Sequence, residues 1–252
     1  MRARDRWRAD CARYFAYLEN PRSRRARWRT LLTTEGLWAI GNYRFGQYLL
    51  EEASRPVRAL LRFPYACSSR LLGLATGIHL FPSTRIGPGL YIGHYGNIWV
   101  SPLASLGARC NLSQGVTIGT AVDAAPVLGD RVWVGPNAVI SGPVRVASGA
   151  VVAACSLVVA HVPENAVVIG VPAKPIAYTG SARLLGPALP EPAGGRPDAA
   201  AGVGVDASGP PGTAGAQDGR ADTAAQPVQA GGEAAPAAVG GKHGEGGAGV
   251  PG

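Results

Sequence analysis

The chain has 252 residues and a formal net charge of +8, which is length enough for one large domain or two small ones. Ten of its arginines fall within the first thirty residues, where charged side chains also exclude the apolar core of a signal peptide. This basic segment lacks the interleaved aromatic motifs of nucleic-acid binders, so we expect a solvated helical face, with peripheral contact to an anionic membrane as the alternative.

The four cysteines match no zinc-binding or redox spacing. Together with the missing signal peptide, this pattern predicts reduced thiols and a cytoplasmic location.

Residues 1–76 are predicted to form an N-terminal α-helical region. Apolar residues such as Leu37 and Ile40 recur at helical spacing, with polar residues on the other faces. A break near residues 54–56 separates this helix from a second apolar helix, which we expect to bend or end near Pro64. Arginines interrupt that second helix, so the sequence predicts no transmembrane segment.

Residues 77–180 are predicted to form a β-helix domain, because over residues 84–159 aliphatic residues recur every six positions, often followed by glycine. A six-residue period is typical of a parallel β-helix, in which three short strands make a triangular coil of about 18 residues. A β-sandwich is the alternative, but its turns would recur at about 8–12 residues. The lattice falls into three blocks, with phase slips at residues 98–100 and 120–127: Ile86, Ile92, Ile98; Val100, Leu106, Leu112, Ile118; Leu128, Val134, Ile140, Val146, Val152, Val158.

The C-terminal segment 181–252 has a different composition. It contains no aromatic residue, and 45 of its 72 positions are glycine, alanine or proline. Such a segment buries too little apolar surface to offset the entropy lost on ordering. We therefore predict a disordered tail of unassigned function.

Three runs resemble the hexapeptide-repeat acyltransferases, in particular the serine acetyltransferase group: residues 84–98 (TRIGPGLYIGHYGNI), 111–119 (NLSQGVTIG) and 170–175 (GVPAKP). The resemblance implies a left-handed β-helix, an exception to the usual crossover rule. It also implies a homotrimer with acetyl-CoA in a groove between neighbouring helices. Some members pair trimers into hexamers through N-terminal helices, of which residues 1–76 would be a shortened version.

His94 is placed by this resemblance where the family has its catalytic histidine. An imidazole with a pKa of about 6.5 is well suited to accept the proton of a hydroxyl that attacks a thioester. Backbone N–H groups would stabilise the oxyanion. We expect direct transfer without an acyl-enzyme intermediate.

The resemblance also suggests residues that contact acetyl-CoA. One group lies beside the loop where the family's pantetheine arm runs, although its glycines could serve only the coil corners. The other closes the β-helix near the nucleotide, where a lysine meets phosphates as a point charge. The candidates are Gly115, Thr117, Gly119 and Thr120 in the first group, and Gly170, Ala173 and Lys174 in the second.

The sequence departs from the serine enzymes around the predicted base. Gly93 and Gly77 stand where those enzymes carry acidic residues, and the loop 120–127 lacks their additional histidine. The acceptor is therefore L-serine or, as the alternative, a sugar hydroxyl of a polysaccharide or its precursor. A catalytically silent scaffold is the third interpretation.

Two further residues are weaker candidates on the acceptor side, His79 and Asp123. His79 is more readily explained by a structural role, and Asp123 by a solvated loop. The histidines His79, His94 and His161 do not reproduce the spacing of a zinc site, so no metal is expected.

Overall fold

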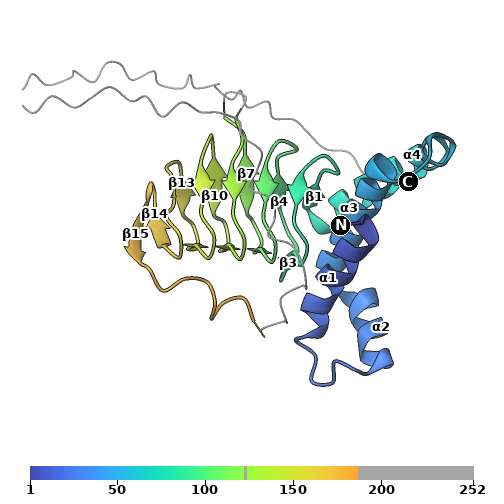
Figure 1. The fold of residues 1–252 in the computed structure, drawn as a ribbon, viewed down its shortest axis with the longest axis horizontal. Coiled ribbons are helices and arrows are strands. Elements are labelled where there is room, and N and C mark those ends of the chain that lie inside the picture. Colours follow the sequence, from blue (N-terminus) through green and yellow to red (C-terminus); the bar gives the residue numbers. More distant parts are fainter. Residues whose placement is uncertain (122–123, 187–252) are drawn as a thin grey trace, which may run out of the picture. The chain divides into compact units, whose positions relative to one another are not determined.

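The computed structural model describes residues 1–121 and 124–186. Four helices precede the strands, as predicted for the N-terminal segment (Figure 1). Helix α4 continues through Pro64, so the expectation that it ends there is wrong, while the alternative, a bend, stays a prediction. The helices are α1 (Ala3–Phe15), α2 (Arg24–Thr33), α3 (Glu35–Glu51) and α4 (Arg55–Thr76).

The strands form three parallel sheets that wind around a common core, which confirms the predicted parallel β-helix (Figure 1). Sheet A contains β1 (Ile78–Leu80), β4 (Ile98–Val100), β7 (Thr117–Gly119), β10 (Val139–Ser141) and β13 (Leu157–Val158). Sheet B contains β2 (Arg85–Ile86), β5 (Ser105–Leu106), β8 (Val127–Leu128) and β11 (Arg145–Val146). Sheet C contains β3 (Tyr91–Ile92), β6 (Asn111–Leu112), β9 (Trp133–Val134), β12 (Val151–Val152), β14 (Val167–Gly170) and the antiparallel β15 (Ala173–Ala177).

The aliphatic lattice forms the core of the β-helix. Each lattice residue is buried, and all except Ile98 pair with a lattice residue of a neighbouring coil, as Ile140 does with Val158, eighteen residues further on. The first phase slip is a local insertion, because Ile92 pairs with Leu112, twenty residues further on. Stacked inward side chains therefore fix the register, while extra residues loop out at the corners.

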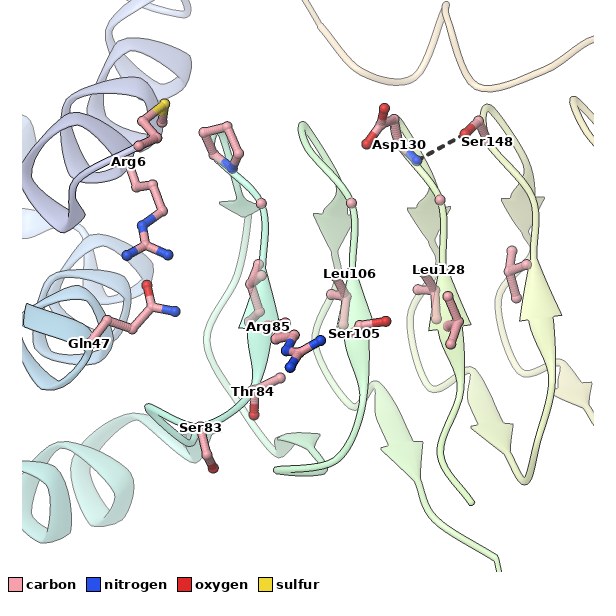
Figure 2. Close-up of a pocket in the computed structure, with 18 of the residues that line it drawn as sticks. Arg6, Gln47, Ser83, Thr84, Arg85, Ser105, Leu106, Leu128, Asp130 and Ser148 are labelled. Atoms are coloured by element: carbon pink, nitrogen blue, oxygen red, sulfur yellow. Dashed lines mark hydrogen bonds between the residues drawn. The ribbon is translucent and has the colours of Figure 1, made fainter. Parts of the chain in front are cut away.

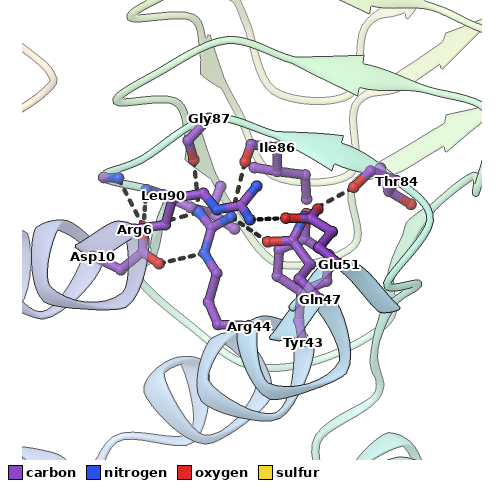
Figure 3. A network of polar contacts seen from close by, with 11 residues as sticks. Arg6, Asp10, Tyr43, Arg44, Gln47, Glu51, Thr84, Ile86, Gly87 and Leu90 are labelled. Atoms are coloured by element: carbon purple, nitrogen blue, oxygen red, sulfur yellow. Dashed lines mark hydrogen bonds and ion pairs between the residues drawn. The ribbon is translucent and has the colours of Figure 1, made fainter. Parts of the chain in front are cut away.

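Helices α1 and α3 cover the backbone edge of the first coil, which has no preceding coil to bond with (Figure 3). The carboxylate of Asp10 accepts hydrogen bonds from the Gly89 and Leu90 amides at 2.7 and 2.9 Å. The Arg44 guanidinium donates to the carbonyls of Ile86 and Gly87 at 2.8 and 2.6 Å. Asp10 and Arg44 also form a buried ion pair, with 2.7 Å between Oδ2 and Nε.

Tyrosines extend this cover along the same edge. The Tyr14 hydroxyl accepts from the Ile92 amide and donates to the Ile92 carbonyl, both at 2.9 Å. The Tyr43 hydroxyl donates to the Thr84 carbonyl at 2.7 Å. Burial raises the pKa of Tyr43 to about 12, so this phenol remains a donor at neutral pH. The helices thus satisfy backbone groups that a free sheet edge would leave exposed.

The folded part extends past the predicted boundary at residue 180. Ser181 and Leu185 are buried, and the Leu185 carbonyl accepts a hydrogen bond from Arg13 at 2.9 Å. Arg13 is itself buried, so the expectation of a solvated basic face is wrong at this position. The predicted tail from residue 187 onward lies outside the described residues, and the division into separate domains at residue 76 stays a prediction.

The buried pair predicts a large loss of stability when one partner is removed. Arg44→Met leaves the Asp10 carboxylate buried without its cation, which should lower the free energy of unfolding by about 3–5 kcal/mol. Urea denaturation followed by circular dichroism measures this change. The exposed Arg4→Met variant, the matched control, should change by less than about 0.5 kcal/mol.

The Asp10→Asn, Arg44→Met double variant removes both charges and should lose less stability than Arg44→Met alone. Equal losses in the single and double variants would contradict a role for the uncompensated charge.

Candidate functional site

His94 lies in the corner between β3 and β4, with an exposed side chain. This corner contains the two-residue insertion, because Ile92 pairs with Leu112 whereas Val100 pairs with Ile118. The insertion carries the imidazole outward from the coil. Within the described part of the chain, the imidazole of His94 has no hydrogen-bond partner, so its nitrogens are available to a bound molecule.

The corner of the next coil lies directly against the His94 corner. The Gly115 amide donates to the Gly96 carbonyl at 2.9 Å, and the Gly96 amide donates to the Thr76 carbonyl at 2.9 Å. Gln114, beside Gly115, has a buried side-chain oxygen without a hydrogen-bond partner. A buried polar atom of this kind calls for an explanation, such as a bound water or ligand. Sequence reasoning did not single out Gln114, although it lies within the run that carries the family resemblance.

Aromatic side chains gather on the outer face of sheet A next to this corner. His79 on β1 pairs in register with Trp99 on β4, and their ring centroids are 5.3 Å apart. Phe81 meets the same indole edge-on at 5.2 Å. Thr117 on β7 pairs with Trp99 from the other side. The structure therefore brings His79 and Thr117 to the two sides of the exposed Trp99. Trp99 lies on β4, the strand that directly follows the His94 corner.

Carboxylates are missing from this region. Between residues 53 and 122 the sequence contains six arginines and no aspartate or glutamate. The segment spans α4, the first coil and most of the second, including both glycines that replace the family's acidic residues. Asp123 lies outside the described residues. No residue of this segment can therefore supply the carboxylate that would orient the imidazole of His94 or hold a cationic acceptor.

The glycines of the predicted acetyl-CoA site differ in what the fold requires of them. Gly115 has a φ of +72°, and a Cβ there would lie 1.9 Å from Oδ1 of Asn137, so the coil itself requires glycine. Gly119 has no positive φ, and its Cβ would meet only Thr117 Cγ2 at 4.0 Å. Gly93 is similarly open, with Tyr91 Cε1 at 3.4 Å. Gly119 and Gly93 thus leave space beside the backbone that the fold does not use, and Thr120, next to Gly119, is exposed.

Gly170, Ala173 and Lys174 lie together in the hairpin between β14 and β15. Gly170 pairs with Ala173, and the Lys174 side chain is exposed. The hairpin is four strand steps along sheet C from β3, a separation of about 19 Å at the usual strand spacing. The structure therefore places these residues on one flank of the β-helix, well away from His94.

A pocket lies elsewhere, on the outer face of sheet B (Figure 2). Its volume is about 950 Å³, and Arg6 and Gln47 from the helices close one end, while Arg85 and Ser105 lie along the strands. His94 stands at the corner between sheets C and A, opposite sheet B. None of the predicted site residues lines this pocket.

Among residues 1–121 and 124–186, no group of three or more histidine, cysteine or acidic side chains is placed to hold a metal ion. His161 accepts a hydrogen bond from the Arg145 amide at 2.9 Å, which explains it structurally. Over these same ranges no helix is long and apolar enough to cross a bilayer.

Comparison with known proteins finds a family match within the β-helix. The family model for "Bacterial transferase hexapeptide (six repeats)" matches residues 125–160. This match agrees with the coil geometry of the same residues, which include β8 to β13.

The chain is also similar to serine acetyltransferases. The enzyme of Mycobacterium tuberculosis is 29% identical over 163 residues, which are 63% of this chain and 64% of that protein. The Neisseria gonorrhoeae serine acetyltransferase in complex with serine is 28% identical, with a TM-score of 0.57 over 69% of each chain. The Brucella abortus enzyme in complex with coenzyme A is 27% identical, with a TM-score of 0.57 over 70% of this chain and 68% of that chain. The chain spans less than two thirds of the length of the first curated relatives.

Substitution by alanine should affect stability at Gly115 but not at Gly119. Gly115→Ala should lower the free energy of unfolding by about 1–3 kcal/mol, because it combines a left-handed φ with a clash against Asn137. Gly119→Ala should change it by less than about 0.5 kcal/mol, since its Cβ meets nothing closer than 4.0 Å. Chemical denaturation of both variants measures the contrast. A comparable loss in Gly119→Ala would show that the fold also requires this glycine.

Proposed function

We propose that this protein transfers the acetyl group of acetyl-CoA to a hydroxyl group, with L-serine as the first acceptor to test. The observation that carries the proposal is the exposed His94 in a looped-out corner of a hexapeptide-repeat coil. The similarity to serine acetyltransferases, including structures with serine and with coenzyme A, supports the acceptor and the acyl donor.

In the proposed reaction the imidazole of His94 is the general base. It accepts the hydroxyl proton while the hydroxyl oxygen attacks the thioester carbonyl. Backbone N–H groups of the coil stabilise the tetrahedral oxyanion. The intermediate then collapses, the C–S bond breaks, and the imidazolium returns its proton to the leaving thiolate. The products are the O-acetyl ester and CoA, and no metal or acyl-enzyme takes part.

The acyl donor is proposed to run along the coils. Its thioester would lie at the His94 corner, where Gly115, Thr117, Gly119 and Thr120 are close in the next coil. The exposed Lys174, with Gly170 and Ala173, is proposed for the phosphate end. We further propose a homotrimer, or a hexamer of paired trimers, because a groove between neighbouring β-helices would enclose a donor that a single flank leaves exposed. A cytoplasmic location stays a prediction.

A second acceptor class, a sugar hydroxyl, is favoured by the charge of the site. Serine carries an ammonium group, and residues 53–122 offer it no carboxylate. A neutral sugar needs no such partner and presents apolar ring faces, which suit an exposed aromatic side chain such as Trp99. The same segment that weakens the serine proposal therefore supports a sugar acceptor.

His94→Ala should abolish acceptor-dependent acetyl transfer. Loss of a general base lowers the rate by about 10²–10⁴-fold. Release of CoA from acetyl-CoA, followed with a thiol reagent in the presence and absence of L-serine, measures it. His161→Gln is the control, because His161 only accepts a hydrogen bond from the Arg145 amide.

Three outcomes of this assay are informative. Serine-dependent release that collapses in His94→Ala supports both the acceptor and the base. If the protein binds CoA but L-serine does not stimulate release of CoA, the proposed acceptor becomes a sugar hydroxyl. Failure to bind CoA would leave the chain a catalytically silent scaffold.

Gly93→Asp restores an acidic side chain next to the proposed base. The fold leaves room for it, since a Cβ at this position meets only Tyr91 Cε1 at 3.4 Å. If the missing carboxylate limits use of serine, kcat/KM for L-serine should rise by about tenfold, corresponding to about 1.4 kcal/mol of transition-state stabilisation. The isosteric Gly93→Asn variant is the control for size without charge. An equal effect in both variants would exclude the charge as the cause.

A further inference from the structure

Helix α4 exposes a continuous apolar stripe along its 22 residues. Apart from Phe63, which is adjacent to Pro64, the stripe residues are spaced alternately by three and four positions, so they lie on one side of the helix. Leu60 is 76% exposed, Phe63 77%, Leu71 67% and Leu74 85%. The complete stripe is Val57, Leu60, Phe63, Pro64, Cys67, Leu71 and Leu74, and every member is exposed.

The protein-facing side of α4 makes polar contacts with α3. Asn42 of α3 donates to the Ser69 hydroxyl at 2.7 Å and accepts from the Ser68 hydroxyl at 2.8 Å. Tyr65 packs against Gly46 on the same side. A water-exposed helix normally turns its large apolar residues toward the core. The exposed apolar stripe of α4 therefore indicates an apolar partner, since patches of this kind mark interaction sites.

The charge of α4 identifies the kind of partner. Its four charged residues are all arginines, Arg55, Arg58, Arg62 and Arg70, and no acidic residue occurs between positions 53 and 122. A second copy of α4 would bring four more arginines to the interface and no acid to pair with them. A surface of anionic phospholipids supplies both an apolar layer and negative phosphates.

We propose that α4 is an interfacial helix that binds the surface of a membrane containing anionic phospholipids. The helix lies in the plane of the membrane, with Leu60, Leu71 and Leu74 in the acyl boundary and its arginines among the headgroup phosphates. This inference rests on α4 alone and is independent of the proposed acetyl transfer. No described helix spans a bilayer, so the contact is peripheral.

Vesicle flotation of the full chain tests the proposal. We expect binding to vesicles of phosphatidylcholine mixed with phosphatidylglycerol, and weak binding to phosphatidylcholine alone. Leu71→Gln with Leu74→Gln should reduce the bound fraction by at least about tenfold, because two buried leucines are removed from the acyl boundary. The matched control is Leu103→Gln, a 66% exposed leucine in a turn of the β-helix. Circular dichroism confirms that each variant is folded.

The arginines of α4 allow a second test by vesicle flotation. Arg62→Gln with Arg70→Gln should weaken binding to anionic vesicles, and added salt should weaken binding of the parent in the same way. Absence of flotation with anionic vesicles, or equal loss in Leu103→Gln, overturns the proposal. A lower solution mass for the Leu71→Gln, Leu74→Gln variant, measured by sedimentation, also overturns it, because the stripe would then be an interface between copies of the chain.

Discussion

A parallel β-helix has an unsatisfied backbone edge where its first coil begins, and the folded chain depends on covering that edge. The strands of the middle coils bond to both neighbours, whereas β2 and β3 have a coil on one side only. Asp10 and Arg44 occupy the position of the missing coil, accepting from two amides and donating to two carbonyls. Because these side chains act in place of a strand, the helices and the coils are parts of one hydrogen-bonded structure, and the register of every later coil starts from this covered edge.

The coil itself could be predicted from the sequence, because its signal is local and repeated. One aliphatic residue every six positions defines the core, and the observed pairs, such as Ile140 with Val158, follow that lattice. The covering network could not be predicted in this way. Asp10 and Arg44 are 34 residues apart and lie about 40 to 80 residues from the backbone groups they bind. The helical pattern of the sequence predicts that both side chains are solvent-exposed charges, and only the tertiary fold brings them together.

The candidate site shows a similar division. The phase slip at residues 98–100 is visible in the sequence, but its consequence depends on register: the two extra residues fall in the corner that carries His94. Sequence alone also treats the site's glycines as equivalent. The structure separates Gly115, whose φ and contact with Asn137 require glycine, from Gly93 and Gly119, which the fold leaves free. Glycine without a packing reason is informative, because the space it leaves beside the backbone remains open to a ligand.

The lack of acidic residues between positions 53 and 122 connects the two proposals. It removes the carboxylate partners of His94, which favours an acceptor without an ammonium group, and it leaves α4 with arginines only. The two regions also touch, since a Cβ at Gly73 of α4 would lie 2.9 Å from the His79 ring, which in turn packs on Trp99. A membrane-bound α4 would therefore be connected to the aromatic face of sheet A through this contact, so that one buried glycine links the proposed lipid-binding helix to the candidate site.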